Sequence, residues 1–413
     1  MMNLPYFIAK RLTSEKKEEA SISSPILTIA VIAIALGIIM MLVSVATGIG
    51  LREKIREKIS AFNGHIIISN YDNNQSEVSL TPIDKNQDFY PNFTSVNGVN
   101  HIQAVITKAG VIRTETTFEG IIFKGVGTDY KFKNLDEYLV EGRIPNVTQE
   151  RENAEVLISE YLAKRMEFSL GDKFTTHFLK DDPSERPNLR QFEIVGIYNS
   201  GFQEFDANFV FGDIRHLQRM NRWSENQIGN FEVFINDFNQ ISQKGLEVHS
   251  QTPSTLDTQT IAEKYYSIFD WLKITDSNIY LIIILMLLVG IINIAVALLV
   301  MILERTQMIG ILKAMGSDNW NIRKIFLYNA FYLITRGLFW GNLIGLGILL
   351  IQKYFGIVKL DPKSYYVNTA PVYLHWDYVL ALNIGTILVC LIVLLIPSYI
   401  ITKISPVKAI RFE

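Results

Sequence analysis

The sequence has 413 residues, of which 49% are hydrophobic, and its 39 Lys and Arg residues nearly balance its 41 Asp and Glu residues. The apolar residues are concentrated in a few long segments, which excludes an ordinary soluble enzyme. A net charge of −2 provides no basic face for phosphate backbones, so we expect no binding to nucleic acid.

Four segments are long and apolar enough to cross a membrane as helices. Residues 20–51, 277–303 and 378–402 contain no Asp, Glu, Lys or Arg, and residues 325–352 contain only Arg336. At 1.5 Å per residue, each can cross roughly 30 Å of hydrocarbon. The first segment is too long for a cleavable signal, so it is predicted to remain as a span. We therefore expect transmembrane helices over residues 25–51, 277–303, 325–352 and 378–402.

The distribution of basic residues predicts the orientation of these helices. Residues 1–24, 304–324 and 403–413 carry 11 Lys and Arg residues, against 3 in the opposite short loop 353–377. The positive-inside rule then places both termini, the loop 304–324 and the tail 403–413 in the cytoplasm. Residues 52–276 are consequently expected on the other side of the membrane.

Residues 52–276 are long enough to form a domain with its own core. A predicted helical stalk, 52–60, continues the first span; Ile55 and Ile59 lie four residues apart among alternating charges, which is typical of a solvated helix. A second stalk, 261–274, leads into the second span. Between the stalks, runs rich in Ile, Val and Phe alternate with turn signals. The expected strands are 65–69, 104–113, 119–126, 156–159, 192–198, 208–212 and 231–235, and the expected helices are 159–168 and 213–220.

The predicted fold class is an α-helical membrane protein with four transmembrane helices and a large α+β extracytoplasmic domain inserted between the first and second spans. The motifs of most catalytic sites are missing. The sequence contains no G-x-x-x-x-G-K-[ST] loop for nucleotide phosphates, and its six histidines never occur at i, i+4 or beside the cysteine. We expect no catalytic residue, metal or cofactor in this chain.

A short amphipathic helix is predicted directly after the second span, in residues 304–316 (ERTQMIGILKAMG). Met308, Leu312 and Met315 recur at four and three residues, which defines an apolar helix face. Gly316 suits a left-handed helix stop, and Asp318 can cap the next helix. Periodicity alone leaves two roles open, anchoring at the membrane interface and docking into the groove of a partner protein.

The same segment resembles the coupling segment of FtsX/MacB-type permeases, which has the pattern E-R-x-x-x-I-G-x-L-x-A-x-G between the second and third spans. Further resemblance runs along the chain, in FIAKR at 7–11, FEIVGIY at 192–198 with Gly201 and Asp206, PVYLHW at 371–376 and SPVKAIR at 405–411. Together these motifs are similar to the LolC/LolE branch, the permease subunits of lipoprotein-releasing ABC transporters.

The resemblance implies partners that supply what this chain lacks. It implies a separate LolD-like ATPase dimer that binds ATP and Mg, a second permease subunit that is the same chain or a paralogue, a LolA-like periplasmic carrier, and lipoprotein substrates in a bacterial inner membrane. A MacB-like efflux permease or an FtsX-like regulator of cell-wall hydrolases is the alternative. The residues that would couple to the ATPase are Glu304, Arg305, Met308, Ile309, Gly310, Leu312, Lys313, Met315 and Gly316.

Two features of the third span call for an explanation. Gly337, Gly341 and Gly345 lie four residues apart, which favours close packing of another helix, although glycine is also simply tolerated in membrane helices. Arg336 adjoins this row. A charge near the bilayer centre costs at least roughly 2.5 to 3.5 kcal/mol, so Arg336 should face protein or water unless a shifted span lets it reach the interface.

The resemblance also implies where the substrate and the carrier bind. A lipid cavity formed by the first and second spans would involve Met40, Met41, Val45, Ile283 and Met286, which provide an adaptable apolar wall, although residues that merely face membrane lipid look the same in sequence.

A charged loop, 179–190, falls where LolC-type subunits carry the hook that recruits the carrier, and its two prolines could stiffen such a protrusion. An ordinary polar hairpin loop is the other interpretation. The candidate carrier-binding residues are Lys180, Asp181, Pro183, Arg186 and Pro187.

Overall fold

The computed structural model describes residues 4–14, 23–73, 76–149, 151–180 and 186–406. The chain divides into two compact units. Unit 1 comprises residues 1–51, 272–358 and 369–413, and unit 2 comprises residues 52–271 and 359–368.

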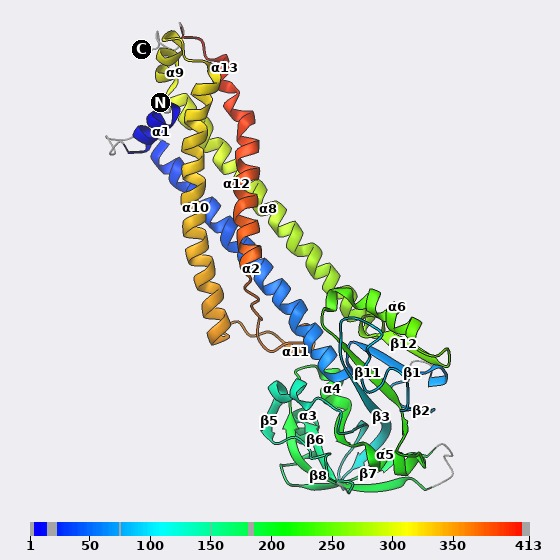
Figure 1. The fold of residues 1–413 in the computed structure, drawn as a ribbon. Helices are drawn as coiled ribbons and strands as arrows, with labels where there is room; N and C mark the ends of the chain where they lie inside the picture. The colour runs from blue at the N-terminus through cyan, green and yellow to red at the C-terminus, as the bar shows by residue number, and fades with distance from the viewer. Residues whose placement is uncertain (1–3, 15–22, 74–75, 150, 181–185, 407–413) are drawn as a thin grey trace. The chain divides into compact units, whose positions relative to one another are not determined.

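Unit 1 is helical, and Figure 1 shows its long helices. Within the described residues, four helices are long and apolar enough to cross a membrane, which confirms the four predicted spans. The helices that contribute to this unit are α1 (Leu4–Ser14), α2 (Ser23–Asn63), α8 (Tyr266–Glu304), α9 (Thr306–Ala314), α10 (Asn319–Phe355), α12 (Trp376–Ser398) and α13 (Ile400–Lys403).

The core of unit 1 is formed by aliphatic side chains from α2, α8, α10 and α12. Ile38 of α2, Ile294 of α8 and Ile334 of α10 are fully buried, and Leu394 of α12 joins them. Helices α10 and α12 are antiparallel and held in register by polar groups: the Asn342 side-chain amide donates to the Asn383 side-chain oxygen at 2.6 Å. These contacts fix which faces of the spans are covered within this chain.

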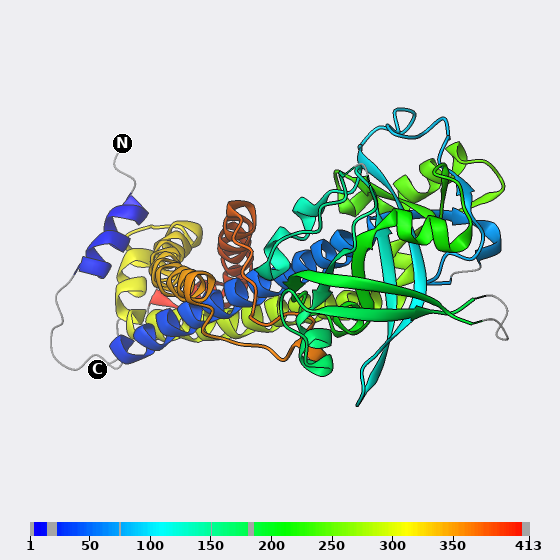
Figure 2. The same cartoon turned by 90° about the horizontal axis from the view of Figure 1, so that it is seen from below.

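Unit 2 is built on a ten-stranded mixed sheet with the order β12-β1-β11-β3-β4-β9-β6-β8-β5, in which β7 pairs with β3 and β8. Only β4 with β9 and β6 with β8 are parallel among the described pairs. Figure 2 shows the long β3–β4 and β7–β8 hairpins. The sheet strands are β1 (Ile66–Asn70), β3 (Val99–Arg113), β4 (Phe118–Val126), β5 (Leu139–Gly142), β6 (Glu155–Ser159), β7 (Lys173–Phe178), β8 (Asn188–Tyr198), β9 (Phe209–Asp213), β11 (Asn230–Ile235) and β12 (Leu256–Thr260), and β2 (Ile83–Asp84) pairs separately with β10 (Gln227–Ile228).

Short helices complete unit 2 and confirm the predicted α+β class. Asp213 caps the helix that follows β9, because its carboxylate accepts from the Arg215 backbone N–H at 2.9 Å. The helices are α3 (Glu160–Met166), α4 (Gln203–Asn208), α5 (Ile214–Asn221), α6 (Ile241–Gln251), α7 (Ile261–Lys264) and α11 (Pro362–Tyr365).

The prediction of a solvated first stalk is wrong. Helix α2 does continue to Asn63, but Ile55 and Ile59 are both 0% exposed and lie in the core of unit 2. Phe62, in the last turn of the same helix, is also buried, and its ring stacks on Phe205 with the ring centroids 4.9 Å apart. An i, i+4 isoleucine pair among charges is therefore the buried face of an amphipathic helix here.

Two other predicted boundaries need correction. The second stalk is not one helix, because α7 ends in front of Tyr265, a break that follows the capping box of Thr260 and Glu263. The polar loop between the hairpin strands is shorter than expected, because β8 already begins at Asn188, which pairs with Phe178 of β7.

Candidate functional site

The segment between α8 and α10 forms the separate helix α9. Helix α8 ends at Glu304, and α9 begins at Thr306. The left-handed backbone of Gly316 (φ 88°) ends this segment, and the Ser317 N–H donates back to the Leu312 carbonyl at 3.0 Å. Asp318 then caps α10. Both sequence predictions, the glycine stop and the aspartate cap, are confirmed.

The two sides of α9 have different surroundings. Ile309 and Gly310 are buried, and Met308 and Leu312 pack against the core of unit 1. Met315, in contrast, is 78% exposed, and Ile311 is 46% exposed. The apolar face expected from periodicity is therefore divided: Met308 and Leu312 belong to this chain's own core, and the outward apolar pair is Ile311 and Met315.

Lys313 attaches the end of α9 to the C-terminal helix α13. Its ammonium group donates to the carbonyl oxygens of Ile401 at 2.6 Å and Ile404 at 2.8 Å. Partial burial lowers the pKa of Lys313. These carbonyls lie at the C-terminal end of α13, where a cation is well placed to bind backbone oxygens and to interact favourably with the helix dipole. Glu304 and Arg305 are exposed at the other end of the segment.

The glycine row of α10 lies against α2. A Cβ at Gly337 would come within 2.7 Å of the Ile34 side chain, and a Cβ at Gly341 would come within 2.9 Å of the Ala35 carbonyl oxygen. At Gly345 the closest approach would be 3.2 Å. The first two distances are shorter than real Cβ atoms accept, so the helices approach closely only because no side chain intervenes.

Arg336 is exposed beside this row. Its guanidinium lies 5.6 Å from the ring centroid of Tyr332, one turn earlier on the same helix. Apart from this ring, the described part of the chain does not surround the side chain with protein.

The five residues named for a lipid cavity do not share one surface. Met41 and Val45 are 2% and 8% exposed and belong to the interior of unit 1, whereas Met40 is 48% exposed. Ile283 and Met286 are half-buried and pack against the core. Adjacent residues on a helix point about 100° apart, so Met40 and Met41 have opposite environments.

The candidate carrier-binding loop is described only in part. Lys180 is half-buried, and Arg186 and Pro187 are exposed between β7 and β8. Asp181 and Pro183 lie outside the described residues. The hairpin also exposes Leu179 and Leu189, which are 63% and 54% exposed.

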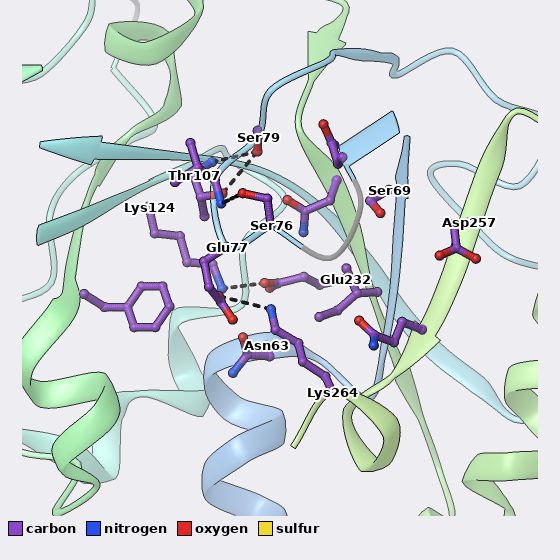
Figure 3. A pocket seen from close by; sticks show the side chains of 16 residues that line it. Asn63, Ser69, Ser76, Glu77, Ser79, Thr107, Lys124, Glu232, Asp257 and Lys264 are labelled. Atoms are coloured by element: carbon purple, nitrogen blue, oxygen red, sulfur yellow. Dashed lines mark hydrogen bonds and ion pairs between the residues drawn. The ribbon is translucent and has the colours of Figure 1, made fainter. Parts of the chain in front are cut away.

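A buried ion pair in unit 2 was missed by sequence reasoning. It lies at a polar pocket with a volume of about 50 Å³. Figure 3 shows Lys124 of β4 approaching Glu232 of β11 in this pocket. Their side chains are 2% and 3% exposed. The Lys124 ammonium donates to Glu232 and to the Phe62 carbonyl at the end of α2, and the Gln103 amide donates to the other Glu232 oxygen at 2.8 Å.

This ion pair joins α2 to two strands of the sheet. Burial lowers the pKa of Lys124, and the neighbouring Glu232 carboxylate opposes that shift. The sequence did contain a signal for a buried ion pair. Each of the two strands is a run of apolar residues interrupted by one charge, IIFKGV at 121–126 and NFEVFI at 230–235. Among the described residues, no three His, Cys, Asp or Glu side chains gather as they would around a metal ion.

Models of two protein families match this sequence. The MacB-like periplasmic core domain matches residues 27–244, more than half of the chain, and the FtsX-like permease C-terminal part matches residues 280–406. The chain is 23% identical over 399 residues to the lipoprotein-releasing system transmembrane protein LolC of Buchnera aphidicola, with 94% of each chain covered. It is 23% identical to LolC of Haemophilus influenzae, with 100% of each chain covered, and 20% identical to LolE of the same organism, with 99% of each covered.

Proposed function

Because this chain belongs to the permease family that carries a MacB-like periplasmic core domain and an FtsX-like C-terminal part, and is of the LolC/LolE type, we propose that it is the permease subunit of a lipoprotein-releasing ABC transporter. The observation that carries the proposal is the end-to-end similarity to LolC and LolE, which covers both units and all four spans. The alternatives, a MacB-like efflux permease and an FtsX-like hydrolase regulator, are not favoured by these relatives.

The transporter extracts lipoproteins from the outer leaflet of the bacterial inner membrane and passes them to a periplasmic carrier. Both termini and α9 lie in the cytoplasm, and unit 2 lies in the periplasm, an orientation supported by the excess of basic residues on the cytoplasmic segments. Extraction from the near leaflet is physically reasonable, because each buried CH₂ of the lipid anchor contributes about 0.8 kcal/mol to retention.

The energy comes from a separate LolD-like ATPase dimer, since this sequence has no nucleotide-binding loop. Helix α9 and its C-cap residue Met315 form the docking element: Ile311 and Met315 face outward and insert into a groove of the ATPase. Movement of α9 reaches the spans because Ile309 is buried in the helical core and Lys313 is bonded to the backbone at the end of α13.

Substitutions on α9 separate docking from folding. Met315→Glu adds a charge to an exposed side chain and should weaken ATPase binding at least tenfold, since burial of one such apolar side chain contributes about 1.5 to 3 kcal/mol. Asn321→Asp, which adds the same charge at an exposed position of α10 outside the stripe of Ile311 and Met315, is the matched control. Co-purification of the ATPase with the tagged permease measures the effect, and equal recovery with both variants would refute the assignment of this face.

The other partners follow from the same family. Lipid chains contact the exposed Met40 side of α2, and Arg186 and Pro187 belong to the surface that recruits a LolA-like carrier. A second permease subunit, another copy or a paralogue, completes the transporter. Membrane lipid surrounds the spans.

Depletion of the protein tests the proposal as a whole. Outer-membrane lipoproteins should then accumulate in the inner membrane, and the permease should co-purify with an ATPase. Normal lipoprotein sorting, together with loss of cell-wall hydrolase activity, would instead support the regulator and contradict the transporter.

A further inference from the structure

The structure contains an apolar groove between α1, α10 and α12 that the transport proposal does not use. All three helices belong to unit 1 and are labelled in Figure 1. The groove has a volume of about 950 Å³. Its lining includes Tyr6 of α1, Tyr328, Phe331 and Tyr332 of α10, and Ile392 of α12. Aromatic and aliphatic side chains dominate, which is the surface that a lipid chain requires.

The contacts between α10 and α12 show the depth of this groove in a membrane. Tyr378 to Ser398 of α12 spans 20 residue steps, about 30 Å, which is the thickness of the hydrocarbon core. Arg323 lies at the Ser398 end, because its guanidinium donates to the Ser398 hydroxyl at 3.0 Å. The groove lining on α10 runs from Lys324 to Thr335, about 16 Å. It therefore begins at the membrane surface near α1 and has the length of one leaflet.

The charge at the surface end of the groove is positive. Lys324 itself lines the groove, and Arg323 is its neighbour in the sequence. Neither α1 nor α10 contains an Asp or Glu residue, and the adjacent Asp318 carboxylate is engaged in capping α10. Lys324 has no carboxylate partner among the described residues; its ammonium lies over the Trp320 ring, 5.8 Å from the centroid.

We propose that this groove is a binding site for an anionic phospholipid of the leaflet next to α1, with the lipid phosphate at Lys324 and one acyl chain along Phe331, Tyr332 and Ile392. The length of the groove favours a lipid over a helix of another subunit, because a membrane-crossing helix would need a groove of about 30 Å. Basic residues at the cytoplasmic ends of membrane helices are suited to anionic headgroups.

Native mass spectrometry of the full-length chain in detergent tests the site. The probes are phosphatidylglycerol and phosphatidylcholine with the same acyl chains. Phosphatidylglycerol should be retained preferentially, and K324Q should weaken its binding about fivefold. Lys353→Gln, at the opposite end of α10, is the matched control and should leave binding unchanged.

A second measurement does not depend on the variants. Phosphatidylglycerol with a photoreactive acyl chain should label peptides containing Phe331 and Tyr332 in the unsubstituted protein. Equal retention of the two lipids, an unchanged affinity in the K324Q variant, or labelling spread evenly over all four spans would overturn the proposal. Protection of these peptides by a second permease chain would assign the groove to a subunit interface and would also overturn it.

Discussion

Replacement of Glu232 by glutamine should strongly destabilise unit 2. The substitution keeps the shape of the side chain but leaves the Lys124 ammonium buried without its counter-charge. Removal of one partner from a buried ion pair costs about 3 to 5 kcal/mol. The loss has an upper limit, because Lys124 can instead give up its proton, which at pH 7 costs about 5 kcal/mol from an ordinary lysine pKa. We therefore expect a loss of about 3 to 5 kcal/mol.

The loss should depend on pH in a defined direction. In E232Q, folded Lys124 is neutral or nearly so, whereas unfolded Lys124 keeps its ordinary pKa of about 10.4. Below that pH the unfolded state binds the additional proton, so the stability of the variant rises with pH. At pH 9 the loss should have fallen to about 2 kcal/mol.

Hydrogen–deuterium exchange of the full-length chain in detergent measures this locally, in peptides that cover β4 and β11. Glu137→Gln is the control: it removes an exposed ion pair with Lys54, 2.8 Å long, and should cost at most about 1 kcal/mol. An E232Q loss as small as that of the control, or one that grows with pH, would refute the role given to the buried pair.

Three further predictions concern other parts of the chain. Gly341→Ala should destabilise unit 1 by about 1 to 3 kcal/mol in thermal denaturation, whereas Gly347→Ala, where a Cβ would meet nothing within 4 Å, should not. Burial lowers the pKa of His65 to about 4, so between pH 6.5 and 4 the unfolded state binds more protons than the folded state. The free energy of unfolding should therefore fall by at most about 3 kcal/mol as the pH is lowered from 6.5 to 4. H65Q should abolish that pH dependence in exchange measurements on β1. Lys313→Met should leave the carbonyls at the end of α13 without their cation and increase amide exchange in residues 400–406 tenfold or more, with α2 unaffected.

The features predictable from sequence are those with local causes. Four charge-free runs give four helices because the bilayer requires both the length and the composition. The stop at Gly316 and the cap at Asp318 follow from backbone conformation and one side-chain hydrogen bond, so three or four residues are enough to predict them. Strands such as Phe118–Val126 were found because their apolar runs are bounded by turns.

The features that sequence could not supply depend on contacts between distant residues. Lys124 and Glu232 are 108 positions apart, and only the β4-β3-β11 order of the sheet brings them together. Burial of Ile55 depends on the residues that surround α2. Strand β12 was missed because its sequence, LDTQT, has no apolar alternation; its pairing with β1 stabilises it.

At helix α9, the candidate docking site, sequence analysis is limited in the same way. Periodicity correctly identifies an amphipathic helix, but it cannot tell which apolar residues cover the chain's own core. Ile309 lies between two apparent stripes and is fully buried, while Met315 is the most exposed member of the segment's apolar set. A charge at Leu312 would consequently damage packing in unit 1, whereas a charge at Met315 addresses docking alone.

Both the sequence and the helix packing indicate that Arg336 places a charge deep in the membrane. Hydropathy identifies a charge whose insertion costs at least roughly 2.5 to 3.5 kcal/mol, and the register of α10 with α12 places it about midway between Arg323 and the far end of the hydrocarbon core. The runs 20–51, 277–303 and 378–402 contain no carboxylate, so a second copy of this chain would bring another arginine to that depth and no counter-charge from its spans. A paralogous permease with an acidic residue in a span would neutralise it, which makes the intramembrane charge of the partner the property to compare between candidate subunits.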